Sequence, residues 1–266
     1  MEDLLAAMER SQLCVGIDPH AGLLAQWGLP DSAEGAREFS LRVVDELAGS
    51  VAALKPQSAF YERFGSAGIA VLEETLAAAR ERGVHTIIDV KRGDIGSTMG
   101  GYAAAYLRPG SPLEADSITV SPFLGPGSLT PAVEMARTHG KGVFALCLTS
   151  NPDGPAVQHA ERDGVPVARA VCQWAERENA ESVTVGLVIG ATVGDAVDQM
   201  GLDLDASRAI ILAPGLGAQG AQVADLPAIF GSACGQVLGS VSRAILALGP
   251  GHMSDAAARF DLKAAP

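Results

Sequence analysis

The sequence has few cysteines and histidines, and both shortages exclude classes of site. Its four cysteines, Cys14, Cys147, Cys172 and Cys234, are far apart and lie mostly within apolar segments. Neither a disulfide framework nor a paired-thiol metal site is therefore predicted. The five histidines show no ligand spacing such as HExxH, and we expect no metal site built from them.

Long apolar runs are missing as well. No stretch approaches the roughly 20 apolar residues that a membrane-spanning helix needs. The first residues, MEDLLAAMERSQ, are acidic and prone to form a helix, and they lack the basic and apolar regions of a signal peptide. We therefore expect a soluble, cytoplasmic protein.

Positive charge is also scarce. The formal net charge is −12 at pH 7, which disfavours binding to nucleic acid or to an anionic membrane, because nothing offsets the repulsion from phosphate groups. An anionic small molecule would need a locally basic pocket. Of the 19 basic residues, the only lysines are Lys55, Lys91, Lys141 and Lys263. In a chain so rich in arginine, a lysine at a strand end suggests that a compact ammonium group is needed there. Chance placement is the alternative.

What the sequence does have is a hydrophobic content of 48% and a regular alternation of short apolar runs with longer amphipathic stretches. This alternation is typical of βα units. Eight strands are predicted, at 13–17, 52–55, 85–90, 117–120, 142–149, 183–189, 208–213 and 235–241. Helical patterns between them include 36–48, 68–82, 129–140 and 166–179.

Eight such units in roughly 250 residues predict a TIM (β/α)8 barrel of the α/β class, with a doubly wound open sheet as the alternative. No linker or charge block divides the chain, so residues 1–266 are expected to form a single domain. Active sites of barrels lie at the carboxyl ends of the strands. Chemically distinctive residues follow several predicted strands there: Asp18, Lys55, Asp89, Lys91, Ser150, Pro214 and Arg243.

The stretch DVKRGDIGST places four charges at the end of the third predicted strand. Residues two apart in a strand point the same way, so Asp89 and Lys91 should face the barrel axis while Val90 faces the helices. The following glycine should turn the chain and bring Asp94 near the start of the next helix, where a carboxylate suits the helix dipole. A salt-bridged helix start is the alternative interpretation.

Lysines that alternate with carboxylates stay charged, because each ammonium gains opposite charges in a partly desolvated site. A charged lysine can stabilise a developing carbanion and then protonate it. The pattern therefore favours decarboxylation and disfavours Schiff-base chemistry, which needs a neutral amine.

The stretch PGLGAQG contains G-x-G-x-x-G, but it follows the seventh strand and no acidic residue lies about 20 positions later, so a dinucleotide site is not predicted. A glycine-rich loop at this place, followed by Arg243 after the eighth strand, is where barrels commonly bind phosphate. Gln219 could add a donor. Ser150 could supply a hydroxyl to the site or cap a turn.

Together these motifs resemble the orotidine 5′-monophosphate decarboxylase family, and in particular its longer bacterial branch. The resemblance covers nearly the whole chain and runs over LCVGIDP, KPQSAFYERFG, DVKRGDIGST, LCLTSNP, VIGAT, APGLGAQG and SVSRAI. It implies a homodimeric TIM barrel that converts orotidine 5′-monophosphate to UMP and carbon dioxide, the last step of UMP synthesis. Such a lyase uses no cofactor and no metal.

The family's catalytic array of Lys, Asp, Lys and Asp is matched here by Lys55, Asp89, Lys91 and Asp94. The resemblance implies that the substrate carboxylate lies against Asp89, and that Lys91 stabilises and protonates a carbanion at pyrimidine carbon 6. In this family the last Asp of the array reaches into the partner's site, where Ile95 and Thr98 would join Asp94.

The resemblance also implies substrate contacts. Asp18 and Lys55 would hold ribose hydroxyls, Ser150 the pyrimidine, and Gln219 and Arg243 the phosphate. Pro214 would help to enclose the base. The chain differs from many relatives outside this branch in having a serine, where those have glycine, directly before Arg243.

Two alternative functions use the same motifs. A sugar-phosphate enzyme resembling 3-keto-L-gulonate 6-phosphate decarboxylase shares D-x-K-x-x-D but binds magnesium with a Glu at the end of its second strand. Lys55 occupies that place here and would repel Mg²⁺. A non-catalytic barrel that binds a phosphorylated metabolite would keep Arg243 and Gln219, but it would not need two lysines alternating with carboxylates.

Overall fold

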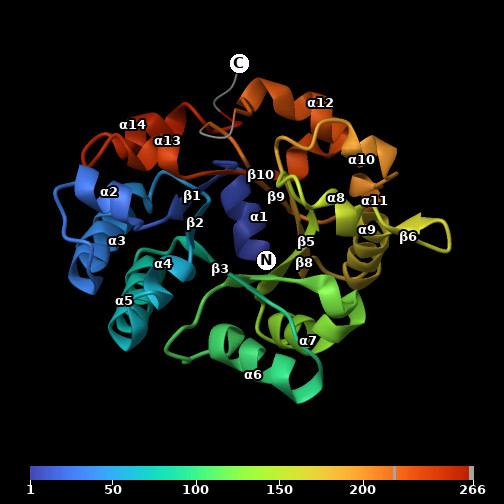
Figure 1. Ribbon diagram of the computed structural model, residues 1–266, viewed down its shortest axis with the longest axis horizontal. Coiled ribbons are helices and arrows are strands. Elements are labelled where there is room, and N and C mark those ends of the chain that lie inside the picture. The colour runs from blue at the N-terminus through green and yellow to red at the C-terminus, as the bar shows by residue number, and fades with distance from the viewer. Residues whose placement is uncertain (218–219, 264–266) are drawn as a thin grey trace.

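The strands form a closed barrel. The computed structural model describes residues 1–217 and 220–263, and in these residues eight parallel strands close in the order β1–β10–β9–β8–β5–β4–β3–β2 (Figure 1). They are β1 Leu13–Ile17, β2 Ala53–Pro56, β3 His85–Arg92, β4 Ser117–Val120, β5 Gly142–Leu148, β8 Val185–Ile189, β9 Ile211–Pro214 and β10 Val237–Val241. The TIM barrel is confirmed, and the open sheet is excluded because β1 pairs with both β2 and β10.

Helices cover the outside of the barrel, as Figure 1 shows. The longer ones are α3 Ala33–Leu47, α5 Gly65–Glu81, α6 Gly96–Leu107, α7 Thr130–Thr138 and α9 Val167–Glu178. Four of these five were predicted from their apolar spacing, and α6 begins where the sequence predicts the next helix after Asp94. In α3, Ser32 accepts a hydrogen bond from the Gly35 N–H and so caps the first turn. The buried face of α3 includes Phe39, Val43 and Leu47.

Shorter elements fill the connections. The short helices are α2 Ala21–Gln26, α4 Ala59–Glu62, α8 Pro155–Gln158, α10 Ala196–Gln199, α11 Leu204–Ser207, α12 Leu226–Phe230, α13 Arg243–Leu246 and α14 Met253–Ala258. Strands β6 Glu161–Arg162 and β7 Val165–Pro166 pair as an antiparallel hairpin outside the barrel. Short 3₁₀ helices lie at Pro122–Leu124, Pro126–Leu129, Val223–Asp225 and Gly231–Gln236.

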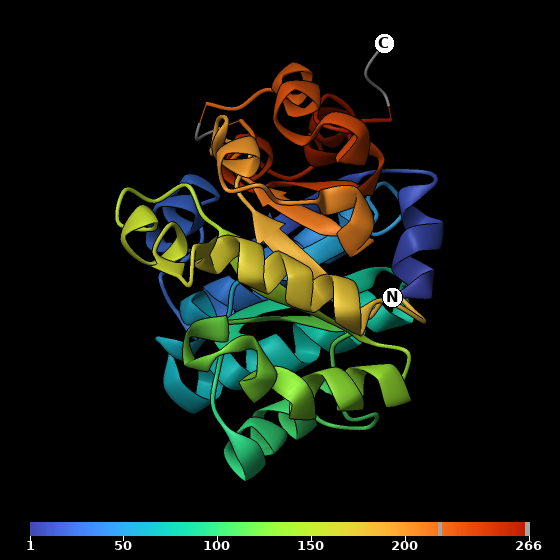
Figure 2. The ribbon, with the colours of Figure 1, turned by 90° about the vertical axis from the view of Figure 1, so that its right-hand side faces the viewer.

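The acidic N-terminal segment closes the amino-terminal end of the barrel. Helix α1, Glu2–Met8, lies across that end, and Figure 2 shows it on the side opposite to the segment that carries α8. Its Leu4 and Met8 are buried in one cluster with Phe144 of the barrel interior. The Met1 ammonium donates to the Gly140 carbonyl at 2.7 Å. The interior is thus filled from this end, and the carboxyl ends of the strands are left to form a pocket.

No helix among the described residues combines the length and the apolar character that crossing a bilayer requires. In the same residues, no group of three or more His, Cys, Asp or Glu side chains is placed to hold a metal ion. The cysteines are free thiols, three of them buried. Burial raises the pKa of the Cys14 thiol to about 12.

Candidate active site

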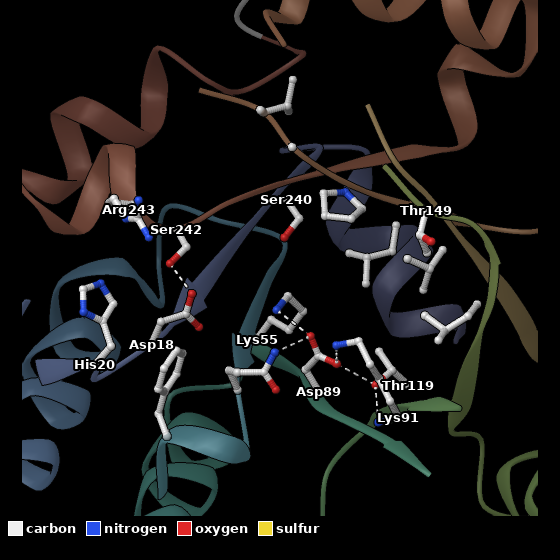
Figure 3. Close-up of a pocket in the computed structure, with 18 residues that line it drawn as sticks. Asp18, His20, Lys55, Asp89, Lys91, Thr119, Thr149, Ser240, Ser242 and Arg243 are labelled. Carbon is white, nitrogen blue, oxygen red and sulfur yellow. Dashed lines mark hydrogen bonds and ion pairs between the residues drawn. The ribbon is translucent and has the colours of Figure 1, made fainter. Parts of the chain in front are cut away.

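A cavity of about 390 Å³ opens at the carboxyl ends of the strands. Its lining brings together six of the residues that the sequence predicted for the site: Asp18, Lys55, Asp89, Lys91, Pro214 and Arg243. Figure 3 shows two groups of polar side chains in it. One surrounds Asp89, and the other contains Asp18, His20, Ser242 and Arg243.

Asp89 is the centre of the first group. Its Oδ2 accepts from Lys55 Nζ at 3.2 Å and from Gln57 Nε2 at 3.0 Å. Its Oδ1 accepts from Lys91 Nζ at 2.6 Å and from Thr119 Oγ1 at 2.8 Å. Asp89 is only 8% exposed, so these four donors take the place of water around the carboxylate.

The charges of this group support one another. Burial alone would raise the pKa of Asp89, but Lys55 and Lys91 outweigh it and hold the pKa of that carboxyl well below its usual range. Burial would lower the pKa of Lys55, but Asp89 and then Asp18 raise it above its usual value. Asp89 and Lys55 are therefore both ionised at neutral pH, as the alternating pattern predicts.

The two lysines differ in how they are held. The Lys55 side chain is 10% exposed, and its ammonium lies 3.2 Å from the Asp89 carboxylate. The Lys91 side chain is 47% exposed, although its ammonium makes the shorter contact with the carboxylate. Both lysines line the cavity, and Lys91 has the more exposed side chain of the two.

Lys91 contacts Asp89 from an irregular backbone. Residue alternation along a strand predicts that the two side chains share a face, but the pairing of β3 with β4 shifts register between Ile88 and Arg92. Lys91 itself has φ 45°, in the left-handed region that non-glycine residues avoid. The predicted contact is present, and a bulge produces it where the prediction assumed a regular strand.

The second group pairs Asp18 with Ser242. The Ser242 hydroxyl donates to Asp18 Oδ2, while Asp18 Oδ1 is buried without a hydrogen-bond partner in the described residues. Gly16 permits this approach of β1 to the end of β10, since a Cβ at Gly16 would lie 2.8 Å from the Ser242 Cβ. Ser242, which directly precedes Arg243, thus orients Asp18 and leaves one carboxylate oxygen for a ligand.

His20 adds a donor beside Arg243. Its Nδ1 accepts from the N–H groups of Gly22 and Leu23, at 3.1 and 3.3 Å, and so caps α2. Burial and the charge of Arg243 lower the pKa of His20, so its ring is neutral at pH 7. With Nδ1 accepting, the proton is on Nε2. That Nε2 is buried and has no hydrogen-bond partner among the described residues.

Several pocket residues were not predicted. They are His20, Gln57, Thr119, Ser240 and Ser242. For Gln57 a signal was available, because it lies two residues after Lys55 and the same alternation rule points it to the same side. A hydroxyl within an apolar strand, such as that of Thr119 in SITV, carries no comparable signal.

Four predicted residues lie outside the lining of this cavity: Asp94, Ile95, Thr98 and Ser150. The first three lie at the start of α6, where Asp94 Oδ1 accepts from the Ile95 N–H at 2.8 Å. Ile95 is 63% exposed. Ser150 follows Thr149, which does line the cavity. Gln219 lies outside the described residues.

The glycines after β9 allow backbone conformations in this loop that other residues rarely adopt. Gly215, Gly217 and Gly220 have φ 116°, 74° and 101°, which side-chain-bearing residues rarely adopt. A Cβ at Gly217 would also lie 2.9 Å from the Ala244 Cβ. Together with Arg243, this loop forms one wall of the cavity, since Gly215 and Leu216 line it.

The fold and the pocket define a (β/α)8-barrel enzyme whose charged Lys–Asp–Lys centre suits an anionic substrate. Residues 11–252 match the model of the Orotidine 5′-phosphate decarboxylase / HUMPS family, and the chain belongs to this family. It is 54% identical over 249 residues to the orotidine 5′-phosphate decarboxylase of Salinispora arenicola, covering 92% of this chain and 88% of that relative. The corresponding Streptomyces coelicolor protein is 52% identical over 246 residues, covering 91% and 87%.

Solved structures agree with this assignment. A Streptomyces avermitilis crystal structure assigned as an orotidine 5′-phosphate decarboxylase superposes with a TM-score of 0.93 at 52% identity, covering 99% of this chain and 93% of that chain. The OMP decarboxylase of Leishmania donovani superposes with a TM-score of 0.77 at 33% identity, covering 96% and 93%.

Proposed function

We propose that this chain decarboxylates orotidine 5′-monophosphate to UMP and carbon dioxide, the last step of UMP synthesis, and that it does so as a carbon–carbon lyase of the cytoplasm. The observation that carries the proposal is the buried, ionised Asp89 held between Lys55 and Lys91. The high identity to curated decarboxylases over most of the chain supports it. The proposal includes a single-domain organisation and a place in the longer bacterial branch.

In the proposed mechanism the substrate carboxylate lies against Asp89. The bond between pyrimidine carbon 6 and the carboxylate breaks, carbon dioxide leaves, and the electron pair stays on carbon 6. The Lys91 ammonium stabilises this carbanion and transfers a proton to it. Because the Lys91 side chain is 47% exposed, solvent can return the proton to the amine once product leaves.

Substrate recognition is assigned to the other side of the pocket. Asp18, one of whose oxygens has no hydrogen-bond partner in the part of the chain that the structure describes, would accept from a ribose hydroxyl. Lys55 would donate to a ribose hydroxyl. Arg243 and Gln219 would bind the phosphate, whose distance from the reacting bond lets binding energy contribute to catalysis. Ser150 would contact the pyrimidine and Pro214 would enclose it. These roles follow from the family resemblance and agree with the charges of the lining.

A homodimer with shared sites is part of the proposal. The family resemblance implies that Asp94, Ile95 and Thr98 reach the pocket of the partner subunit, and their position outside the lining of their own cavity agrees with this. Apolar side chains are exposed on the loops that follow β3 and β4. Ile95, after β3, is 63% exposed, and Phe123 and Leu124, after β4, are 75% and 54% exposed. The Ser121 N–H donates to the Arg92 carbonyl at 2.8 Å, so the two loops leave the barrel side by side.

The magnesium-dependent sugar-phosphate alternative is disfavoured by Lys55. Its ammonium lies 3.2 Å from Asp89 at the end of β2, where a metal-binding carboxylate would be needed. A barrel that only binds a metabolite is disfavoured, because binding alone does not require the buried ion pair of Lys55 with Asp89.

The test follows the ultraviolet absorbance of orotidine 5′-monophosphate, with a chelator present, for the wild type and for Lys91→Ala. The wild type should consume the substrate, and the variant should lose about 10²- to 10⁴-fold in kcat, the usual contribution of a proton-transferring side chain. A wild type that leaves the substrate intact, or a fully active variant, contradicts the proposal. Activity that the chelator abolishes would favour the magnesium-dependent alternative.

A further inference from the structure

We propose that Thr119 is a positioning residue for the reaction, because its hydroxyl holds the bulge from which Lys91 reaches Asp89. This inference rests on the role proposed above for Lys91. Thr119 lies in β4, is 1% exposed, and lines the cavity. Figure 3 shows it beside Asp89, on the side of the carboxylate that Lys91 contacts.

The bulge is defined by the pairing of β3 with β4. Ile88 pairs with Ile118, and the next paired residues are Arg92 and Val120. Three residues of β3, Asp89 to Lys91, therefore stand opposite Thr119 alone. The segments that follow the two strands remain close, since a Cβ at Gly93 would lie 2.5 Å from the Ser121 carbonyl oxygen.

A bulge of this kind leaves backbone N–H groups without a regular partner across the ladder. Here the Thr119 hydroxyl accepts from the N–H of Val90 at 3.0 Å and from the N–H of Lys91 at 2.9 Å. The same hydroxyl donates to Asp89 Oδ1 at 2.8 Å. One hydroxyl has two acceptor sites and one proton, so this arrangement uses all of its hydrogen-bonding capacity.

These three bonds fix both ends of the Lys91 side chain. At the backbone end they hold the left-handed conformation, with φ 45°, which is otherwise unfavourable for lysine. At the ammonium end they orient Asp89 Oδ1, which Lys91 Nζ contacts at 2.6 Å. The hydroxyl thereby sets where the ammonium lies, without itself needing to touch the substrate.

The experiment compares Thr119→Val, which keeps the shape but removes the hydroxyl, with Thr119→Ser, which keeps it. We expect Thr119→Val to lose about 100-fold in kcat, the loss that a misplacement near 1 Å can cause, with KM close to the wild-type value. Thr119→Ser should retain most of the wild-type kcat. A crystal structure of Thr119→Val should show Lys91 out of the left-handed region.

The matched control is Thr86→Val on β3. Thr86 is a buried threonine whose hydroxyl pairs with Asp116 at the amino-terminal end of the strand, away from the pocket. This variant should keep the wild-type kcat, which separates the loss of a buried hydroxyl in general from the loss of this one. If Thr119→Val does not fold, Thr119→Cys takes its place, because a thiol is a weak hydrogen-bonding group and the same loss is expected.

Wild-type kcat in Thr119→Val or in Thr119→Cys, or an equal loss in Thr119→Ser, overturns the positioning role. Those results require an active wild type. A wild type that does not consume orotidine 5′-monophosphate would instead contradict the proposed function, so the two failures are distinguishable.

Discussion

Asp89 and His85 are both buried titratable residues of β3, but at neutral pH Asp89 is ionised and His85 is neutral. Asp89 stays ionised because two lysines face it. His85 lies at the amino-terminal end of the strand, where its Nε2 shares a hydrogen bond of 2.9 Å with the Ser117 hydroxyl. Burial lowers the pKa of His85 to about 4, and although Asp116 opposes this shift, the Met1 ammonium and Lys141 add to it.

The lowered pKa makes His85 a source of pH-dependent stability. Its value in the folded chain lies below the unfolded value of 6.5, so protonation favours the unfolded state. The contribution is fully present above pH 6.5 and is lost as the pH falls from 6.5 towards 4, by about 3 kcal/mol in all. Asp89, whose pKa is also lowered, loses its contribution only below its ordinary value of 3.8.

We therefore expect His85→Gln, whose amide can still pair with Ser117, to flatten the dependence of the free energy of unfolding on pH between 6.5 and 4.5. Urea unfolding at several pH values measures this. His139→Gln, at an exposed position, is the control and should follow the wild type. An unchanged slope in His85→Gln would refute the assignment.

At the scale of residues, strand ends led to six of the 18 residues that line the cavity. Asp18, Lys55, Asp89 and Lys91 were found because charged residues directly after apolar runs collect at one rim. Thr119 was not found, because its role depends on a bulge, and a bulge depends on the register between β3 and β4. The register describes how two strands pair, so it cannot be read from the sequence of either strand alone.

At the scale of elements, all eight barrel strands were predicted, and their errors are confined to the ends. The sixth strand was expected from residue 183 but begins at Val185, because the Asn179 side chain accepts from the N–H groups of Thr184 and Val185. The seventh was expected from residue 208, but Arg208 has φ 53° and ends α11. Both starts are set by side-chain or turn geometry that apolar periodicity does not encode.

Asn179 provides the prediction at this scale. It is fully buried, and besides its two accepted bonds its Nδ2 donates to the carbonyls of Val185 and Ser207, at 2.7 and 3.0 Å. Replacing it with leucine leaves four backbone groups without their partner. We expect Asn179→Leu to lower the free energy of unfolding by about 3 kcal/mol, measured in urea.

The kcat of Asn179→Leu should stay near the wild-type value below its unfolding temperature, because Asn179 binds the amino-terminal start of β8 and the pocket lies at the opposite end of the strands. Gln199→Ala removes an exposed amide that bonds Asp195, and it should leave stability unchanged. A stability loss in Asn179→Leu no larger than in Gln199→Ala would contradict the capping role.

At the scale of the whole molecule, three residues predicted for the site, Asp94, Ile95 and Thr98, do not line the cavity of their own barrel. The described pocket collects Asp89 and Lys91 but not Asp94, although DVKRGDIGST holds all three within six residues. The exposed apolar side chains Ile95, Phe123 and Leu124 lie on the segments that follow β3 and β4, and Asp94 lies on the first of these segments. A second copy of the chain placed there would bury these apolar side chains and bring Asp94 to a second pocket, as the proposed homodimer requires.

Mixing two inactive variants tests this arrangement. In dimers of Lys91→Ala with Asp94→Asn, one shared site carries both defects and the other carries none. An equal, randomly assorted mixture should therefore recover about a quarter of the wild-type activity, measured by substrate absorbance after co-expression. Lys91→Ala mixed with Asp89→Asn is the matched control and should recover nothing, because each of those side chains serves the pocket of its own barrel. Recovery in neither mixture, with dimers present by light scattering, would place Asp94 outside the partner's site.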